Sequence, residues 1–366
     1  MNGARNADRT LIISTFLLVA SGVVMVYSTS FVVAMKKFGD EYFFVKKHVA
    51  FAIIGLVLFV VFSRIPYHLY KKLTYPILIG SVILLACLFV PGVGHKVGGA
   101  TRWIRVMGIT FQPSELAKVA VIIFLAYSLE AKQGVIKSFS LGFLPNILIP
   151  GIVIAMIMVQ PDFGSAVTLS LMVFILCFVG GVSALHLTGL LAMVVPALYV
   201  VVAHFGYMTQ RMLTYIDPWK DPYGAGFQII QSFLAFGSGG VWGLGLGEGR
   251  QKLFYLPEAH TDFIFSVIGE ELGLIGVGVV IFLYAVFFVS GLMVALRAKD
   301  LFGTYLALGL TLLITLQAMI NMAVVMGVLP SKGLPLPLIS YGGSSLVMSL
   351  VAVGIILNVY IKGNEA

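Results

Sequence analysis

Charged side chains are scarce in this sequence. Asp, Glu, Lys and Arg make up 10% of the 366 residues, whereas a soluble globular domain carries about 25%. Hydrophobic residues make up 60% of the chain. This imbalance excludes a soluble domain and predicts a protein that crosses a membrane several times.

Cysteine and long basic runs are also nearly absent. The only two cysteines, Cys87 and Cys177, each lie inside an apolar run, so we expect neither a disulfide nor a cysteine metal site. No more than two Lys or Arg residues follow one another, although the formal net charge is +8. Such scattered charge indicates contact with anionic lipid headgroups and signals for membrane orientation, and does not favour nucleic acid.

Long apolar runs are what the sequence does contain. A spanning helix needs about 20 mostly apolar residues, and we expect the first run, from about Leu11, to be retained because it lacks a small-residue cleavage site. We predict an all-α, polytopic bundle of about ten spans, forming one domain over residues 1–366. The predicted spans are 10–33, 48–63, 73–91, 113–130, 141–160, 164–182, 184–205, 263–296, 303–329 and 345–361.

Two of these runs have unusual lengths. The second is short, and the eighth is too long for one crossing. We therefore expect the eighth to begin outside the hydrocarbon core, to tilt, or to bend near Gly273, Gly276 and Gly278.

The loops predict the orientation. Ten spans place both termini on one side, and the short segments on that side are denser in Lys and Arg than the opposite loops. This bias predicts cytoplasmic termini. The polar loops 92–112 and 206–262 then lie on the outer face, so we expect any chemistry there.

The outer loop 206–262 is too hydrophobic to be a flexible tether. Apolar residues recur at helical spacing in 227–236, which predicts a short helix lying in the interface. The glycine-rich run 237–249 superficially resembles a dinucleotide-binding fingerprint, but no strand precedes it. Its glycines are expected to allow close packing or mobility instead.

Asp262 is the most informative carboxylate, because it stands where this loop meets the eighth span. It has two interpretations. It can cap the helix N-terminus, or it can act as a general base that accepts a proton from a substrate hydroxyl. His260, two residues earlier, could form a metal pair with it, but no third ligand is evident.

Other polar residues also lie near the outer ends of spans. Glu115 and Lys118 share one helix face and are expected to pair, either as a structural lock or with Lys118 contacting a substrate anion. Arg102 and Arg105, in a loop without carboxylates, either grip phosphate oxygens or reach lipid headgroups. Asp162 lies in a Pro-Asp-Phe-Gly turn that needs no functional explanation.

Two further segments carry polar groups at membrane depth. At least one of Glu270 and Glu271 should meet a partner inside the bundle or reach the interface. The Pro- and Gly-rich segment 333–345 must be buried in protein or line a cavity. Ser340, Ser344 and Ser345 there either satisfy backbone groups or contact a polar substrate.

These motifs resemble the SEDS family of bacterial cell-wall synthesis proteins (FtsW, RodA, SpoVE). The resemblance covers nearly the whole chain, and the strings around Asp262 and Ser340 are specific. Residues 257–260 and 330–335 resemble the division branch, FtsW, more than RodA, and the sporulation branch stays open. The matching strings are Met25-Val-Tyr-Ser28, Gly99-Ala-Thr-Arg-Trp103, Gln112-Pro-Ser-Glu115 with Lys118, Gln160-Pro-Asp162, Tyr223-Gly-Ala-Gly-Phe-Gln228, Leu256-Pro-Glu-Ala-His-Thr-Asp-Phe-Ile-Phe265 and Leu336-Pro-Leu-Ile-Ser-Tyr-Gly-Gly-Ser344.

The resemblance implies a ten-span peptidoglycan glycosyltransferase of the bacterial cytoplasmic membrane. It would join lipid II units on the outer face and release undecaprenyl pyrophosphate, with Asp262 matching the family's essential aspartate. No cofactor is certain, although a divalent cation such as Mg or Mn could help with the pyrophosphate. The residues we expect to bind substrate are Arg102, Gln112, Glu115, Lys118, Asp162, Arg211, His260, Lys332 and Ser340.

The implied partners are a class B penicillin-binding protein transpeptidase, other division membrane proteins and membrane lipids. Two alternatives stay open: a lipid II flippase and a non-catalytic division scaffold. A transporter should show internal repeats and polar sites at mid-membrane, whereas the polar residues here gather on one face. A scaffold does not explain a charge pair such as Glu115 and Lys118.

Overall fold

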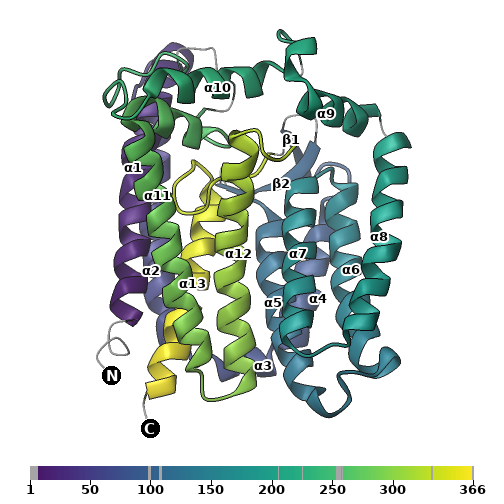
Figure 1. Cartoon of the computed structure of the whole chain (residues 1–366). Coiled ribbons are helices and arrows are strands. Elements are labelled where there is room, and N and C mark those ends of the chain that lie inside the picture. Colours follow the sequence, from purple (N-terminus) through teal and green to yellow (C-terminus); the bar gives the residue numbers. More distant parts are fainter. Residues whose placement is uncertain are drawn as a thin grey trace.

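The structure is a computed structural model, and it describes residues 7–97, 100–106, 109–204, 206–224, 226–252, 257, 259–330 and 333–364. Ten long helices stand side by side as a bundle (Figure 1). They are α1 Ala7–Phe38, α2 Phe43–Arg64, α4 Thr74–Cys87, α5 Pro113–Ala131, α6 Leu144–Val159, α7 Phe163–Val179, α8 Ala184–His204, α11 Ile264–Leu296, α12 Leu301–Val325 and α13 Gly343–Asn364.

The ten-span prediction is confirmed in its main points. Among the described residues, six helices are long and apolar enough by themselves to cross a membrane, and α4, α7 and α8 contain shorter apolar stretches. The second span is not short, since α2 has 22 residues. Helix α1 begins and α13 ends at the same end of the bundle (Figure 1), as an even number of spans requires.

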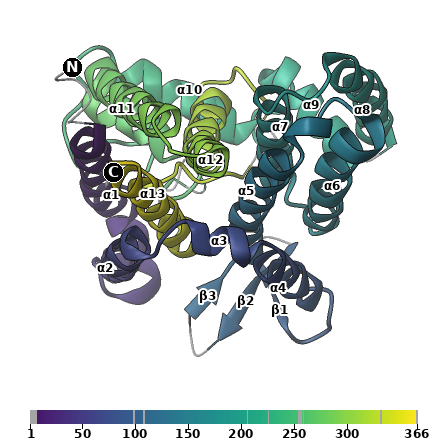
Figure 2. The same cartoon turned by 90° about the horizontal axis from the view of Figure 1, so that it is seen from below.

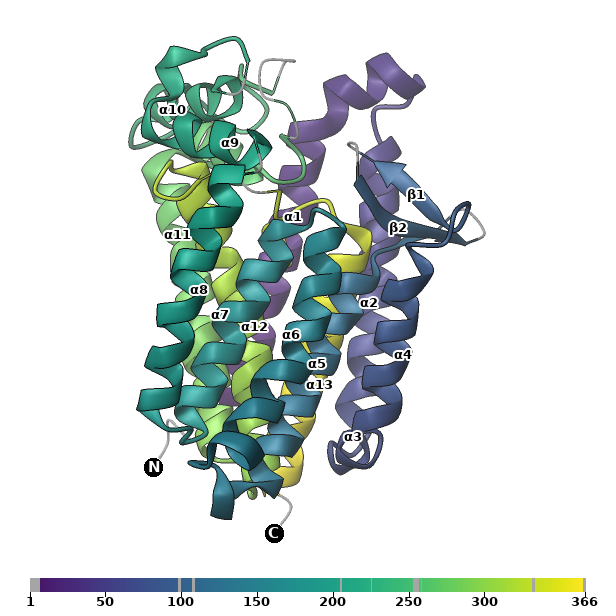
Figure 3. The same ribbon diagram turned by 90° about the vertical axis from the view of Figure 1, so that its right-hand side faces the viewer.

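The prediction of an all-α fold missed a small sheet in the loop between α4 and α5. Strands β1 Gly94–Val97, β2 Ala100–Val106 and β3 Ile109–Phe111 form an antiparallel sheet in the order β1-β2-β3. His95 pairs with Trp103, and Ile104 pairs with Phe111. The sheet projects beside α4 at the edge of the bundle (Figures 2 and 3). Strands this short leave little periodicity to read.

Short helices complete the two ends of the bundle. At the end where the chain termini lie are α3 His68–Lys72 and the turns η2 Gln133–Val135 and η3 Phe139–Phe143. The loop between α8 and α11 folds into α9 Gly206–Ile216, η4 Pro218–Lys220 and α10 Phe227–Gly239. Helix α10 lies across the opposite end of the bundle (Figure 1), which confirms the helix predicted at 227–236. Its Ser232 hydroxyl donates to the carbonyl of Val325 (2.6 Å) and shares a hydrogen bond with Ser266.

Helix α11 bends at Gly273, which is one of the alternatives expected from its length. Gly273 has φ +64° and ψ −162°, a backbone conformation that is essentially restricted to glycine. The glycine-rich segment packs into this bend. The amides of Leu244 and Gly245 donate to the carbonyls of Glu270 and Glu271, each at 3.0 Å. In return, the Leu274 amide donates to the carbonyl of Gly240 (3.0 Å).

This exchange explains why glycines are needed in the segment that packs against α11. A Cβ atom on Gly243 would lie 2.2 Å from the carbonyl oxygen of Glu271, and a Cβ on Gly239 would lie 2.0 Å from that of Gly269. The close-packing interpretation of the 237–249 run is therefore confirmed. The segment supplies the hydrogen bonds that the bend removes from α11, as a membrane helix requires.

The segment between α12 and α13 turns back into the bundle (Figure 1). Leu334, Leu336, Leu338 and Ile339 are all buried. A Cβ atom on Gly22 of α1 would lie 2.7 Å from the carbonyl oxygen of Ile339. The prediction that this irregular segment is buried in protein is confirmed, and it delivers residues 333–341 to the end of α11 that carries Asp262.

Candidate active site

Asp262 lies in a turn immediately before α11. The N-cap position of that helix is occupied by Phe263, whose side chain makes no capping hydrogen bond, so Asp262 is not the N-cap residue itself. The side chain is half-buried. Its Oδ2 atom lies 3.0 Å from the position that a Cβ atom on Gly333 would occupy. The carboxylate therefore adjoins the segment that links α12 and α13.

The backbone around Asp262 is held at three consecutive carbonyl groups. The carbonyl of His260 accepts from the Tyr341 amide (3.0 Å), and that of Thr261 accepts from the Ser340 hydroxyl (2.6 Å). The carbonyl of Asp262 accepts from Nδ2 of Asn321 (2.8 Å). The turn is thus attached to two segments that are distant in sequence.

Ser340 and Ser344 act on backbone groups here. Ser340 accepts from the Leu336 amide (2.8 Å) while it donates to Thr261. Ser344 accepts from the Gln112 amide (3.0 Å) and donates to the carbonyl of Thr110 (3.2 Å). These contacts support the first of the two interpretations for Ser340 and Ser344. The Ser345 hydroxyl, in contrast, is buried without a hydrogen-bond partner among the described residues. A role of Ser340 in substrate binding stays a prediction.

His260 contributes to an aromatic cluster beside the Asp262 turn. Its ring centroid lies 4.7 Å from that of Phe44 and 5.7 Å from that of Tyr341. His48, on α2, is buried at the other side of Tyr341, with ring centroids 6.2 Å apart. Within the described part of the chain, no three His, Cys, Asp or Glu side chains group as a metal site, and the divalent cation stays a prediction.

Glu115 and Lys118 form a buried ion pair at the start of α5, as predicted. The Lys118 ammonium lies 2.9 Å from Glu115 Oε1, and the side chains are 0% and 7% exposed. Lys118 also donates to Oε1 of Gln317 on α12 (2.9 Å). Lys118 therefore faces the interior in this structure, which favours the structural-lock interpretation over a direct substrate contact.

Arg102, Gln112 and Asp162 meet at the N-terminal ends of α5 and α7. The Arg102 guanidinium donates to the backbone carbonyls of Gln160 (3.2 Å) and Pro161. Asp162 caps α7 by accepting from the Ser165 amide (3.2 Å), and it also accepts from Gln112 Nε2 (3.1 Å). These bonds give Asp162 a structural role, and its predicted contact with substrate stays a prediction.

The remaining predicted residues are more dispersed. Arg105 is exposed on β2, and Arg211 is half-buried on α9. Lys332 lies outside the described residues. The structure therefore places Asp262, His260 and Ser340 together, places Arg102, Gln112 and Asp162 together, and connects Glu115 and Lys118 to α12.

A buried charge cluster lies further along α11, and sequence reasoning missed its lysine, Lys252. Glu271 accepts from the Ser28 hydroxyl of α1 (2.6 Å) and pairs with the Lys252 ammonium (2.5 Å). Glu270 accepts from the Arg250 amide (2.7 Å). The expectation of an internal partner for this carboxylate pair is confirmed. Lys252 could not be assigned from spacing, because its partners come from α1 and α11.

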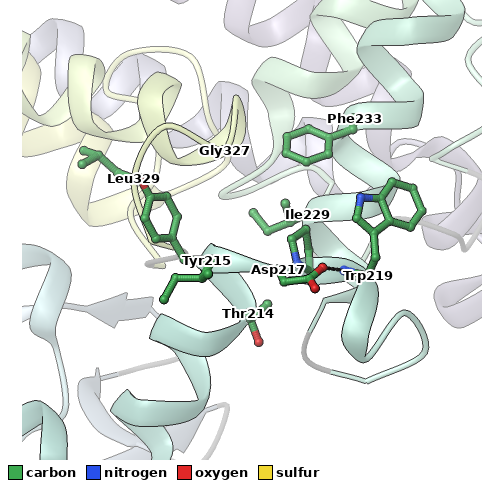
Figure 4. Close-up of a pocket in the computed structure, with 10 residues that line it drawn as sticks. Thr214, Tyr215, Asp217, Trp219, Ile229, Phe233, Gly327 and Leu329 are labelled. Carbon is green, nitrogen blue, oxygen red and sulfur yellow. Dashed lines mark hydrogen bonds between the residues drawn. The ribbon is translucent and has the colours of Figure 1, made fainter.

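A cavity of about 260 Å³ opens between α9, η4, α10 and the residues just after α12 (Figure 4). Tyr215, Asp217 and Trp219 line it, with Phe233 at its wall. The Tyr215 hydroxyl donates to the carbonyl of Val328 (2.9 Å). Asp262 does not line this cavity, and no sequence motif pointed to it.

The profile of the cell cycle protein family FtsW/RodA/SpoVE matches residues 8–365. The chain belongs to this family. It is 49% identical over 352 residues to the probable peptidoglycan glycosyltransferase FtsW of Geobacter sulfurreducens, covering 96% of this chain and 94% of that protein. It is 42% identical over 352 residues to the stage V sporulation protein E of Bacillus subtilis, covering 96% of both.

Solved structures of the FtsW/RodA/SpoVE family share the fold. A peptidoglycan synthase complex, described for its structural coordination of polymerization and crosslinking, contains a chain that matches with a TM-score of 0.80 and 31% identity. That match covers 97% of this chain and 98% of the other. The rod shape determining protein RodA of Thermus thermophilus matches with a TM-score of 0.72 and 26% identity, covering 97% of each chain.

Proposed function

We propose that this protein is a peptidoglycan glycosyltransferase that polymerises lipid II on the outer face of the bacterial cytoplasmic membrane, for the septal wall. The observation that carries the proposal is the 49% identity, over 96% of the chain, to a probable peptidoglycan glycosyltransferase FtsW. The proposal treats residues 1–366 as one membrane domain with cytoplasmic termini. A crosslinking transpeptidase of the class B penicillin-binding proteins is the proposed partner, because the matched complex coordinates polymerization with crosslinking.

The proposed chemistry is a single displacement. Asp262 accepts the proton of the acceptor sugar hydroxyl, and the hydroxyl oxygen forms a bond to the anomeric carbon of the donor. The bond from that carbon to the pyrophosphate oxygen breaks, and undecaprenyl pyrophosphate leaves. An α-linked donor then yields a β-linked product by inversion, which needs one base and no covalent intermediate.

The leaving pyrophosphate needs positive charge. Arg102, Arg105 and Arg211 are the proposed outer-side contacts, because guanidinium groups match phosphate oxygens. Lys118 is proposed to act with them, although its present contacts with Glu115 and Gln317 are internal. A divalent cation would supply the same electrostatic stabilisation.

The first prediction concerns Asp262. We expect Asp262→Asn to lower the rate of lipid II polymerisation by at least about 100-fold, because the variant lacks the general base. The measurement uses purified protein, with its transpeptidase partner if required, and labelled lipid II resolved as glycan ladders on a gel. Glu248→Gln, a change at an exposed carboxylate of the same outer loop, is the control and should polymerise normally.

Normal ladders from Asp262→Asn would overturn the assignment of the base. A well-folded wild-type protein that makes no ladders but moves lipid II between the leaflets of liposomes would replace the glycosyltransferase with a flippase.

A further inference from the structure

Helix α12 carries two buried amide side chains at the depth of the candidate site. Gln317 is 3% exposed and Asn321 is 2% exposed. Their spacing of four residues places them on one face of the helix, one turn apart. A polar group at this depth is costly to leave unpaired. Of the four polar atoms in these two amides, only Asn321 Oδ1 lacks a hydrogen-bond partner among the described residues. Both amides meet the segments that surround Asp262.

Gln317 lies between the buried ion pair and the segment after α12. Its Oε1 atom accepts from Lys118 (2.9 Å), and its Nε2 atom donates to the carbonyl of Pro335 (3.1 Å). Lysine has only donors and a carbonyl has only acceptors. An amide is therefore the group that satisfies both neighbours at once, and a carboxylate or an apolar side chain of the same size is not.

Asn321 joins the same segment to the Asp262 turn. Its Nδ2 group donates to the carbonyl of Leu334 (2.6 Å) and to the carbonyl of Asp262 (2.8 Å). These two carbonyls belong to chain segments about 70 residues apart in sequence. One side chain thus fixes the distance between the turn that carries Asp262 and the segment that begins at Gly333.

We propose that Gln317 and Asn321 are positioning residues of the transferase reaction, which set the place of the Asp262 carboxylate through its backbone. The inference rests on the proposed function. Two of the contacts around the turn, at His260 and Thr261, come from Tyr341 and Ser340 of the same 333–341 segment. The amides hold that segment at Leu334 and Pro335, so they act on the whole turn.

The expected effect is on the chemical step. A general base must be held close to its productive geometry, and a misplacement of about 1 Å costs about 100-fold in rate. Asn321 donates only to backbone carbonyls, at Asp262 and Leu334, so substrate binding should change little when it is replaced. We expect Asn321→Leu to lower kcat for lipid II polymerisation by about 100-fold with KM within about threefold of wild type.

Gln317→Glu is the second variant. It keeps the shape of Gln317 and an acceptor for Lys118 but removes the donor to Pro335, so we expect a lower kcat of the same kind. Thr315→Val is the matched control. Thr315 is a buried polar residue on the same helix whose hydroxyl donates only to backbone carbonyls of α12, at Thr311 (2.8 Å) and Leu312. This control should keep the wild-type kcat.

A second readout does not depend on activity. The amides of Leu336 and Tyr341 are hydrogen-bonded to Ser340 and to His260. Hydrogen exchange at these amides should become faster in Asn321→Leu and Gln317→Glu, and should stay unchanged in Thr315→Val. A general loss of folding would instead lower the melting temperature and the active fraction and leave kcat per folded molecule intact.

The outcomes separate the two proposals. If kcat stays within about threefold of wild type and exchange at Leu336 and Tyr341 is unchanged in both variants, the positioning role is overturned. If Asn321→Leu does not insert into the membrane, Gln317→Glu decides by the same criteria. If wild-type protein makes no glycan, the glycosyltransferase proposal fails, and the exchange comparison still tests whether the amides hold the turn.

Discussion

At the residue scale, the degree of burial distinguishes ionisable side chains with a structural role from those available for chemistry. Lys118 is completely buried and bonded to Glu115 and Gln317, and Lys252 is buried against Glu271. Asp262, by contrast, is half-buried in the turn before α11. A carboxylate that reaches the surface can exchange a proton with a substrate, whereas a fully enclosed ion pair has no such access.

The pair of Glu115 and Lys118 gives a prediction at this scale. Lys118→Met should lower the free energy of unfolding by about 3–5 kcal/mol, because it leaves the Glu115 carboxylate buried without a counter-charge. Adding Glu115→Gln to Lys118→Met should recover most of the loss. Thermal unfolding of the purified protein in detergent measures both effects, and equal losses in the single and double variants would contradict this account.

Helix α11 shows how an element-scale irregularity is stabilised. The bend at Gly273 breaks the regular hydrogen-bond ladder, and the 240–245 segment replaces the missing partners. The same segment precedes Lys252, whose ammonium pairs with Glu271 two residues before the bend. The loop between α8 and α11 is thus anchored into the helix that begins beside Asp262.

The bend predicts different outcomes for two glycines of α11. In Gly273→Ala the new Cβ would lie 2.4 Å from the amide nitrogen of Gly243, at a φ of +64°. The backbone strain alone should cost about 1–3 kcal/mol. Gly278→Ala should be neutral or slightly stabilising, because nothing lies within 4 Å of its Cβ position and alanine favours helix.

Melting temperatures of the two purified variants test this pair. A Gly273→Ala variant as stable as Gly278→Ala would show that the bend does not exist in the folded protein.

At the scale of the whole molecule, the two ends of the bundle differ in structure. The sheet, α9 and α10 lie at one end, and the ends of the chain lie at the other (Figure 1). The candidate site belongs to the end that carries α10, through the Ser232 contacts with Val325 and Ser266. An enzyme that acts on one side of a membrane needs its site at one end of the bundle, and the two ends here differ in this way.

Orientation gives the prediction at this scale. In a background without Cys87 and Cys177, a cysteine at the exposed Trp219 of η4 should react with a membrane-impermeant maleimide in intact cells. A cysteine at the exposed Lys299, between α11 and α12, should react only after the membrane is permeabilised. The reverse labelling pattern would contradict cytoplasmic termini and would place the candidate site inside the cell.

Local patterns in the sequence predict features whose partners lie within a few residues. Apolar run lengths located the ten helices, and the spacing of Glu115 and Lys118 predicted their pairing. The excess length of the 263–296 run and its glycines offered a bend near Gly273, Gly276 and Gly278 as one of three alternatives, and the structure has it at Gly273. Each of these follows from the rise and periodicity of a helix, which act over one or two turns.

The sequence by itself therefore determined the membrane class, the spans and the carboxylate at the mouth of α11. Only the tertiary structure decided that Phe263 and not Asp262 occupies the N-cap position, that Ser340 holds the Thr261 carbonyl, and that Asn321 joins two separate segments at Asp262. Lys252 likewise finds Glu271 and Ser28 only in the folded bundle. Such contacts depend on how separate helices pack against one another. The periodicity within one segment does not determine that packing.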